Sequence, residues 1–206
     1  KTFKHYGVIS IDFFRQKKFN LDEIVLELDV NTEDILSNKE GMILLASHFG
    51  NWEMFLPIIN LTRKISAIVR TQIFLGGDKF ISELRTFKNV TLISNNSSLT
   101  DMLRPLLNSE ILLILNDQRP KKSGNLINFF GSPSLVPKGA GHFYLQSKAT
   151  LTFGYCILKE NYKYEFRIEK IDINSNLDSK DSIIEEINIK YLALLEKIIK
   201  KHPEQY

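Results

Sequence analysis

The sequence predicts an α/β fold, a single domain with a largely parallel central sheet flanked by helices. Short, β-rich apolar runs alternate along the chain with stretches of helical periodicity, which is typical of strands joined by crossover helices. No linker divides the chain, and its 206 residues suit one domain with a sizeable core. We therefore expect a single domain over residues 1–206.

An amphipathic helix is predicted at the start of the chain, because Phe3, Tyr6, Ile9 and Phe13 recur at three- and four-residue steps. Apolar runs predict strands at residues 24–28, 42–47, 65–70, 90–93, 111–115, 127–130, 151–158 and 164–171. The clearest helices are predicted at residues 78–87, 98–107, 138–148 and 182–201. Apolar residues of the last helix form one stripe, which indicates one buried face.

Composition excludes several classes of function. Cys156 is the only cysteine, so the chain has no internal disulfide, which favours a reducing, cytoplasmic setting. The four histidines lack Cys-x-x-Cys or His-x-x-x-His spacing, so we expect no metal site and no cofactor. A formal net charge of +3 argues against nucleic acid but is compatible with acidic partners or anionic lipid. No apolar stretch reaches the roughly 18 residues that would span a membrane.

Polar side chains come at the ends of three predicted strands. His48 follows the strand at 42–47, Arg70 ends the next one, and Asn116, Asp117 and Gln118 follow a third. In open α/β sheets ligands gather outside the carboxyl ends of the strands. Convergence of these side chains on one edge would make a site.

His48 and Glu53 are the pair with the clearest chemistry. On one continuous helix a separation of five residues would place them roughly 140° apart. Gly50 and Asn51 predict a tight turn, and Asn51 can cap a helix, so a strand, turn and helix would bring Glu53 back toward the imidazole. Histidine suits proton abstraction from a hydroxyl, and a carboxylate on its other nitrogen fixes the tautomer. The alternative is that the two residues have only structural roles. His48 would then cap a loop, and Glu53 would lie in the solvated first turn of a helix, where the helix dipole favours a negative charge.

The string SHFGNWE at residues 47–53 resembles the His-x-x-x-x-Asp/Glu motif of the lysophospholipid acyltransferase superfamily. Within it, the bacterial lipid A biosynthesis acyltransferases, the lauroyl and myristoyl transferases, match best. The resemblance continues through Arg70, Arg85, the NDQ of residues 116–118, NFFGSPSLVPKGAGH at 128–142 and the final HPEQY. In that family HPEQY usually runs on into a tryptophan and a basic stretch, and a membrane-anchoring helix precedes the domain. This sequence carries neither, and we expect no anchoring helix.

The resemblance implies a glycerolipid acyltransferase-like fold and transfer of a fatty acyl chain. The donor would be a thioester, acyl carrier protein or acyl-CoA, and the acceptor a hydroxyl of a lipid A precursor at the cytoplasmic face of the bacterial inner membrane. His48 would be the general base and Glu53 its orienting carboxylate. Backbone N–H groups near Gly50 and Asn51, or Arg70, are candidate donors to the oxyanion.

Other polar residues are candidates for substrate binding. Arg70 could hold a phosphate of the acceptor or of the phosphopantetheine arm, or make only a surface salt bridge. Asp117 and Gln118 could bind acceptor hydroxyls, or Asp117 could cap a turn. Lys138 begins a predicted helix whose N-terminus could receive an anion, although a plain helix start is an equal alternative.

Lipid contact is predicted near the start of the chain, where Arg15, Lys17 and Lys18 lie beside Phe13 and Phe14, as in interfacial segments. Peripheral membrane contact would follow. Two alternatives to lipid A acylation stay open. One is acylation of a lysophospholipid, aminolipid or glycolipid by the same machinery, and the other is an inactive module that binds lipid or a carrier protein.

Overall fold

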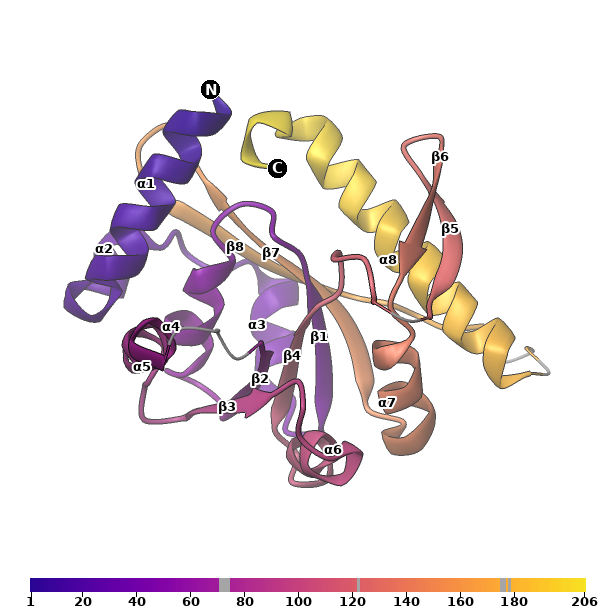
Figure 1. Cartoon of the computed structure of the whole chain (residues 1–206). Helices are drawn as coiled ribbons and strands as arrows, with labels where there is room; N and C mark the ends of the chain where they lie inside the picture. Colours follow the sequence, from indigo (N-terminus) through magenta and orange to yellow (C-terminus); the bar gives the residue numbers. More distant parts are fainter. Residues whose placement is uncertain (71–74, 122, 175–176, 178) are drawn as a thin grey trace.

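A mostly parallel sheet forms the centre of the computed structural model, which describes residues 1–70, 75–121, 123–174, 177 and 179–206 (Figure 1). These residues build a six-stranded sheet in the order β3-β2-β4-β1-β7-β8. Only β8 runs antiparallel to its neighbour in this sheet. The strands are β1 Met42–Ala46, β2 Ile65–Val69, β3 Val90–Ser94, β4 Ile111–Leu115, β7 Thr150–Leu158 and β8 Tyr164–Lys170. The predicted α/β class and largely parallel sheet are confirmed.

Helices cover both faces of the sheet (Figure 1). They are α1 Thr2–Arg15, α2 Leu21–Ile24, α3 Val30–Ser37, α4 Phe55–Ile59, α5 Leu75–Leu84, α6 Leu99–Leu107, α7 Gly139–Ser147 and α8 Lys180–Lys201, with short 3₁₀ helices η1 Gln16–Lys18, η2 Trp52–Met54 and η3 Pro203–Gln205. The opening helix and the four later helices predicted from periodicity are confirmed, with ends shifted by one turn or less. Within the described part of the chain, no helix has the length and hydropathy needed to cross a membrane.

Two hydrophobic layers sandwich the sheet. Ile43 and Leu45 of β1 pack into the layer shared with α6, α7 and α8, whereas Leu44 and Ala46 pack into the layer shared with α3, η2 and α4. All of β1 is buried, because a parallel strand covered on both faces has no solvent side. This burial is why the strand reads as a continuous apolar run.

The strand expected at residues 24–28 is wrong. The segment begins in α2, and only Val25 forms an isolated bridge, with Tyr164 at the start of β8. Farther along the β8 edge, side chains of α3 take the place of a strand. The Asn31 amide donates to the Ile168 carbonyl at 3.0 Å, and the Ile168 N–H donates to Thr32 Oγ1 at 3.2 Å.

A separate antiparallel hairpin pairs β5 Asn125–Phe129 with β6 Ser132–Val136. The sequence predicts one strand here, at 127–130, and the second strand of the hairpin was not predicted. Proline is tolerated at a sheet edge, and this two-stranded sheet consists of edges. Phe130 and Gly131, both with positive φ, form the tight turn that joins the strands.

Candidate active site

The carboxyl ends of β1 and β4 bring His48 and Asp117 together. The two strands are adjacent and parallel, with Ala46 paired to Leu115, so residues two positions beyond the pair also face each other. His48 Nδ1 donates to Asp117 Oδ1 at 2.9 Å, and the His48 backbone N–H donates to Asp117 Oδ2 at 2.9 Å. The Asp117 side chain is only 6% exposed, compared with 32% for His48. Both carboxylate oxygens therefore hold one residue from two directions.

This contact leaves the other ring nitrogen of His48 directed at substrate space. With the proton on Nδ1, Nε2 carries a lone pair, and the Gln118 side-chain amide lies 3.3 Å from it in a position to donate. The Trp52 ring packs edge-on against the imidazole, with centroids 5.0 Å apart. The ring is thus fixed in plane and in tautomer.

Glu53 has a different partner from the one expected. Its Oε2 accepts from Arg85 Nε at 2.9 Å, and its Oε1 accepts from Arg85 Nη2 at 2.5 Å and from Trp52 Nε1 at 3.2 Å. The predicted contact between Glu53 and the imidazole is therefore corrected, because Asp117 occupies Nδ1. The short helix η2 places Glu53 beside Arg85, whose planar guanidinium binds a carboxylate with two parallel hydrogen bonds.

The turn between His48 and Glu53 uses its own N–H groups for folding. Gly50 has a φ of +62°, and a Cβ there would lie 2.0 Å from the Cys156 carbonyl oxygen. The Gly50 N–H donates to the Gln205 carbonyl at 2.9 Å, and the Asn51 N–H donates to the Cys156 carbonyl at 2.8 Å. Neither N–H is free for an oxyanion, which corrects the expectation that they serve as its donors.

Asn51 is also not a substrate contact in this structure. The residue is 1% exposed, and its side-chain amide donates to the buried Tyr164 hydroxyl at 2.9 Å. That hydroxyl donates in turn to Asp12 of α1. The predicted side-chain cap on the following helix is absent, since the Asn51 amide is directed toward Tyr164.

A cavity of about 570 Å³ opens beside the His48 imidazole. Its polar end contains Arg70, Arg85, Glu53 and Gln118 together with His48, and its apolar wall contains Leu56, Ala67, Val69, Leu113 and Leu115. The volume lies within the roughly 300–1,000 Å³ of small-molecule sites. Three predicted strand ends, those of β1, β2 and β4, therefore do converge on one site.

A family model described as bacterial lipid A biosynthesis acyltransferase matches residues 1–206. The chain belongs to this family. The match confirms the resemblance found in residues 47–53 and in the later motifs, and it makes the protein a lipid acyltransferase.

The acyltransferase is also similar to a crystal structure of the 1-acyl-sn-glycerophosphate (LPA) acyltransferase PlsC from Thermotoga maritima. The two chains are 13% identical, and the similarity covers 95% of this chain and 88% of that chain with a TM-score of 0.48. No curated protein matches this chain significantly.

Lys138 of the acyltransferase does not line the cavity, so the structure does not bring it together with the other predicted site residues. Its Nζ lies 3.4 Å from Asp181 Oδ1, in the first turn of α8. Lys138 precedes α7, which packs into the layer of Ile43 and Leu45. Leu56, Ala67 and Leu113 of the cavity wall belong to the opposite layer.

Three tyrosines of the acyltransferase surround Asp117. Burial, with the charge of Asp117 as a second cause, raises the pKa of Tyr206 to about 12 and also raises the pKa of Tyr6 and of Tyr191. Their hydroxyls stay neutral at physiological pH. The Tyr191 hydroxyl is already committed, because it donates to the Ala46 carbonyl at 2.9 Å.

Proposed function

We propose that this acyltransferase moves a fatty acyl chain from a thioester donor, acyl carrier protein or acyl-CoA, to a hydroxyl of a lipid A precursor, with His48 as the general base. The observation that carries the proposal is the His48–Asp117 hydrogen bond at the polar end of an apolar-walled cavity. Membership of the lipid A biosynthesis family supports this choice of acceptor.

The proposed reaction begins when His48 Nε2 takes the proton of the acceptor hydroxyl. The oxygen attacks the thioester carbonyl carbon, a C–O bond forms, and the carbonyl oxygen becomes an oxyanion. When this intermediate collapses, the C–S bond breaks and the thiolate takes the proton from the His48 imidazolium. An ester and a free thiol result. Asp117 stabilises the imidazolium that exists between the two proton transfers.

Arginines supply positive charge at the polar end of the cavity. Arg70 lies in the cavity wall, and with the N–H groups of Gly50 and Asn51 committed it is the best candidate among the predicted donors for the oxyanion or a substrate phosphate. Glu53 holds Arg85 in the same wall through the paired hydrogen bonds. We assign Glu53 an effect on substrate through Arg85, and Asp117 the role of orienting His48.

The apolar wall suits a fatty chain. Leu56, Ala67, Leu113 and Leu115 offer hydrocarbon surface without hydrogen-bonding groups, and a fatty tail needs an apolar trough rather than specific donors. Gln118 lies against His48 Nε2, so its amide has to move aside when the acceptor hydroxyl arrives.

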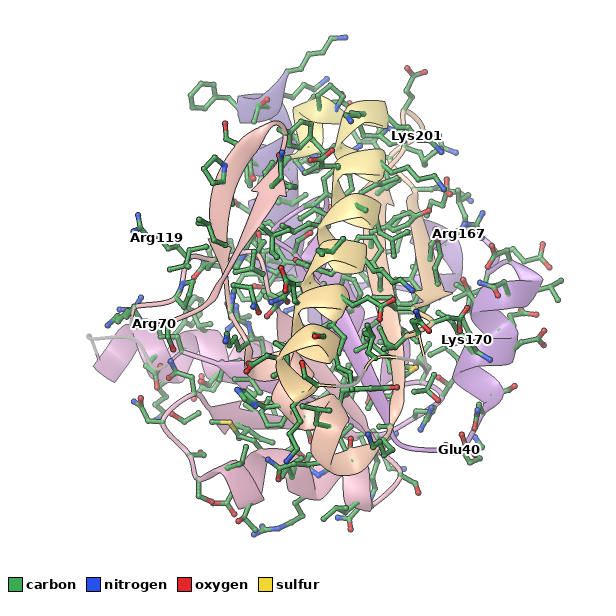
Figure 2. The ribbon with its side chains drawn as sticks, turned by 90° about the vertical axis from the view of Figure 1, so that its right-hand side faces the viewer. Glu40, Arg70, Arg119, Arg167, Lys170 and Lys201 are labelled. Carbon is green, nitrogen blue, oxygen red and sulfur yellow. The ribbon has the colours of Figure 1, made fainter. Side chains whose placement is uncertain are left out.

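The proposed donor carries phosphate, and arginines lie on the side of the molecule where it would approach. Figure 2 shows Arg70 and Arg119 on the same side, away from Arg167 and Lys170. Arg119 and Lys121 are exposed, whereas Lys122, the next basic residue in the sequence, lies outside the described residues. Both an acyl carrier protein and acyl-CoA present an anionic phosphopantetheine arm.

Helix α1 supports the proposed peripheral contact with the cytoplasmic face of the inner membrane. Phe3 is 96% exposed. Phe14 and Phe80 stack on each other, and each ring keeps at least half of its surface exposed. Basic residues Lys17 and Lys18 follow in η1. Exposed aromatic rings beside lysines fit an anionic bilayer surface, where the rings sink below the headgroups.

The test is acyl transfer by the purified protein, with acyl carrier protein and CoA thioesters offered to a lipid A precursor, a lysophospholipid, an aminolipid and a glycolipid. His48→Ala should lower turnover roughly 100-fold or more without lowering the melting temperature, since a general base is lost from a partly exposed position. Mass spectrometry identifies the acylated lipid. Normal turnover by His48→Ala contradicts the proposed mechanism. If the enzyme prefers another acceptor, that lipid replaces the lipid A precursor as the proposed substrate. If no acceptor is acylated, the protein is better described as a binding module.

A further inference from the structure

The backbone of Gly50, two residues beyond His48, is held by both ends of the described chain. Its N–H donates to the carbonyl of Gln205 in η3, at 2.9 Å. Its carbonyl accepts a hydrogen bond from His5 Nε2 in α1, at 3.3 Å. Figure 1 shows the two chain ends close together, and α1 contacts η3 directly. Two segments about two hundred positions apart therefore meet on the backbone of one residue of the active-site turn.

We propose that His5 and Gln205 are positioning residues, which hold the backbone N–H and carbonyl of Gly50 and thereby set the direction of the His48 imidazole. The proposal rests on the proposed function only in taking His48 as the base. Neither residue touches the cavity, so each acts on the reaction through the turn.

Gln205 is built into the fold by a pair of hydrogen bonds that fix its backbone. Its side-chain Oε1 accepts from the Leu158 N–H at 3.0 Å, and its Nε2 donates to the Leu158 carbonyl at 2.9 Å. The side chain thus fastens η3 to the last residue of β7. Gln205 is only 4% exposed. With the side chain fastened in this way, its backbone carbonyl is presented to Gly50.

His5 holds the carbonyl of the same residue, Gly50. It is 6% exposed and lies in α1, with its ring edge-on to Tyr6. Donation to the Gly50 carbonyl places a proton on Nε2. Burial lowers the pKa of His5, which keeps the ring neutral at neutral pH.

The turn needs these partners because its conformation is demanding. Gly50 adopts a positive φ, and the Cys156 carbonyl leaves no space for a side chain. The imidazole of His48 extends from the same turn to Asp117 and to the cavity. A displacement of about 1 Å at such a group can cost on the order of 100-fold in rate, since the reacting atoms lose their alignment.

Variants that keep shape and remove hydrogen bonds test the proposal. Gln205→Met and His5→Phe preserve side-chain bulk, and His5→Gln restores an N–H donor toward Gly50. We expect Gln205→Met and His5→Phe to lower kcat by roughly 10- to 100-fold with KM nearly unchanged. His5→Gln should recover most of the loss. Lys4→Gln and Glu204→Gln, neighbours in the same two elements, serve as matched controls with normal kcat.

A spectroscopic signature separates positioning from general stability. The proton that His48 Nδ1 donates to Asp117 should give a downfield NMR resonance, and this resonance should move or broaden in Gln205→Met and His5→Phe but not in the controls. Folded variants with normal kcat and an unmoved resonance overturn the proposal, as does failure of His5→Gln to recover more than His5→Phe. If Gln205→Met does not fold, the two His5 variants decide. The resonance reports the His48–Asp117 hydrogen bond whether or not His48 is the base. A failure of the proposed function is therefore seen in a different measurement, as normal turnover by His48→Ala.

Discussion

The two ring nitrogens of His48 have neighbours of different charge. Nδ1 donates to the carboxylate of Asp117, whereas Nε2 meets the neutral amide of Gln118. A negative charge on the Nδ1 side stabilises the imidazolium that forms when Nε2 takes a proton. An amide on the Nε2 side can be displaced by a hydroxyl of similar hydrogen-bonding capacity. These contacts fit the proposed transfer of a proton from the acceptor hydroxyl to Nε2.

Asp117→Asn should lower kcat roughly 100-fold or more, because the amide cannot stabilise the imidazolium as the carboxylate does. Added to His48→Ala, it should cost little further activity, since residues that act as a unit are not additive. Glu53→Gln should cost less and act mainly on KM, because Glu53 binds Arg85. Steady-state kinetics of the single and double variants measure this. The opposite result would identify Glu53 as the orienting carboxylate. In that case Asp117→Asn would lower kcat only slightly, and Glu53→Gln would lower it strongly but add little to the loss in His48→Ala.

At the scale of elements, α3 closes one edge of the sheet with side chains. Thr32 is fully buried, and its hydroxyl oxygen accepts the Ile168 N–H that a further strand would otherwise pair. Asp29 starts the helix by accepting from the Thr32 N–H at 2.9 Å, which fixes the Thr32 side chain against β8. A covered edge also prevents β8 from pairing with another chain.

Thr32→Val should reduce the free energy of unfolding by about 1–3 kcal/mol, because the isosteric side chain leaves the Ile168 N–H unsatisfied. Urea unfolding followed by circular dichroism measures the loss. Thr91→Val, at an exposed position of β3, is the matched control and should change stability little. Equal effects of the two substitutions would mean that the contact to Ile168 contributes nothing.

At the scale of the whole molecule, the site and the aromatic surface of α1 belong to the same side of the sheet. Phe13 of α1 lies under the Arg85 guanidinium at 5.6 Å, and Tyr6 contacts Trp52 at 6.3 Å between ring centroids. Arg85 and Trp52 both line the cavity. A lipid surface that received α1 would therefore lie close to the active site, where a lipid acceptor is needed.

Substituting serine for both Phe14 and Phe80 should weaken binding to vesicles of anionic phospholipid by roughly 10- to 100-fold, since burying an aromatic side chain contributes about 1.5–3 kcal/mol. Vesicle sedimentation measures the partition. Leu107→Ser, which removes an even more exposed apolar side chain from α6 on the opposite layer, is the control and should bind normally. A larger loss with Leu107→Ser would place the membrane contact on the other side.

The sequence by itself determined the class of fold and the family, and it predicted His48 as the candidate base. Apolar periodicity reports which residues are buried, so β1, β4 and α8 were predictable from local pattern alone, and the string at residues 47–53 carries the family resemblance. Local pattern was insufficient where long-range contacts complete the structure. The segment at residues 24–28 has the pattern of a strand, yet α3 occupies most of the edge it would have joined.

Only the tertiary structure decided which carboxylate holds His48. Glu53 is closer in sequence, but Asp117 faces the imidazole because β4 is the direct neighbour of β1 and the strands are in register. Strand order is set by how the whole sheet packs between its two layers. It cannot be predicted from the spacing of residues within 48–53. The same reason left Lys138 out of the cavity wall and joined both chain ends at Gly50. Such contacts depend on three-dimensional packing between distant segments, whereas residue periodicity reports only the burial of each segment.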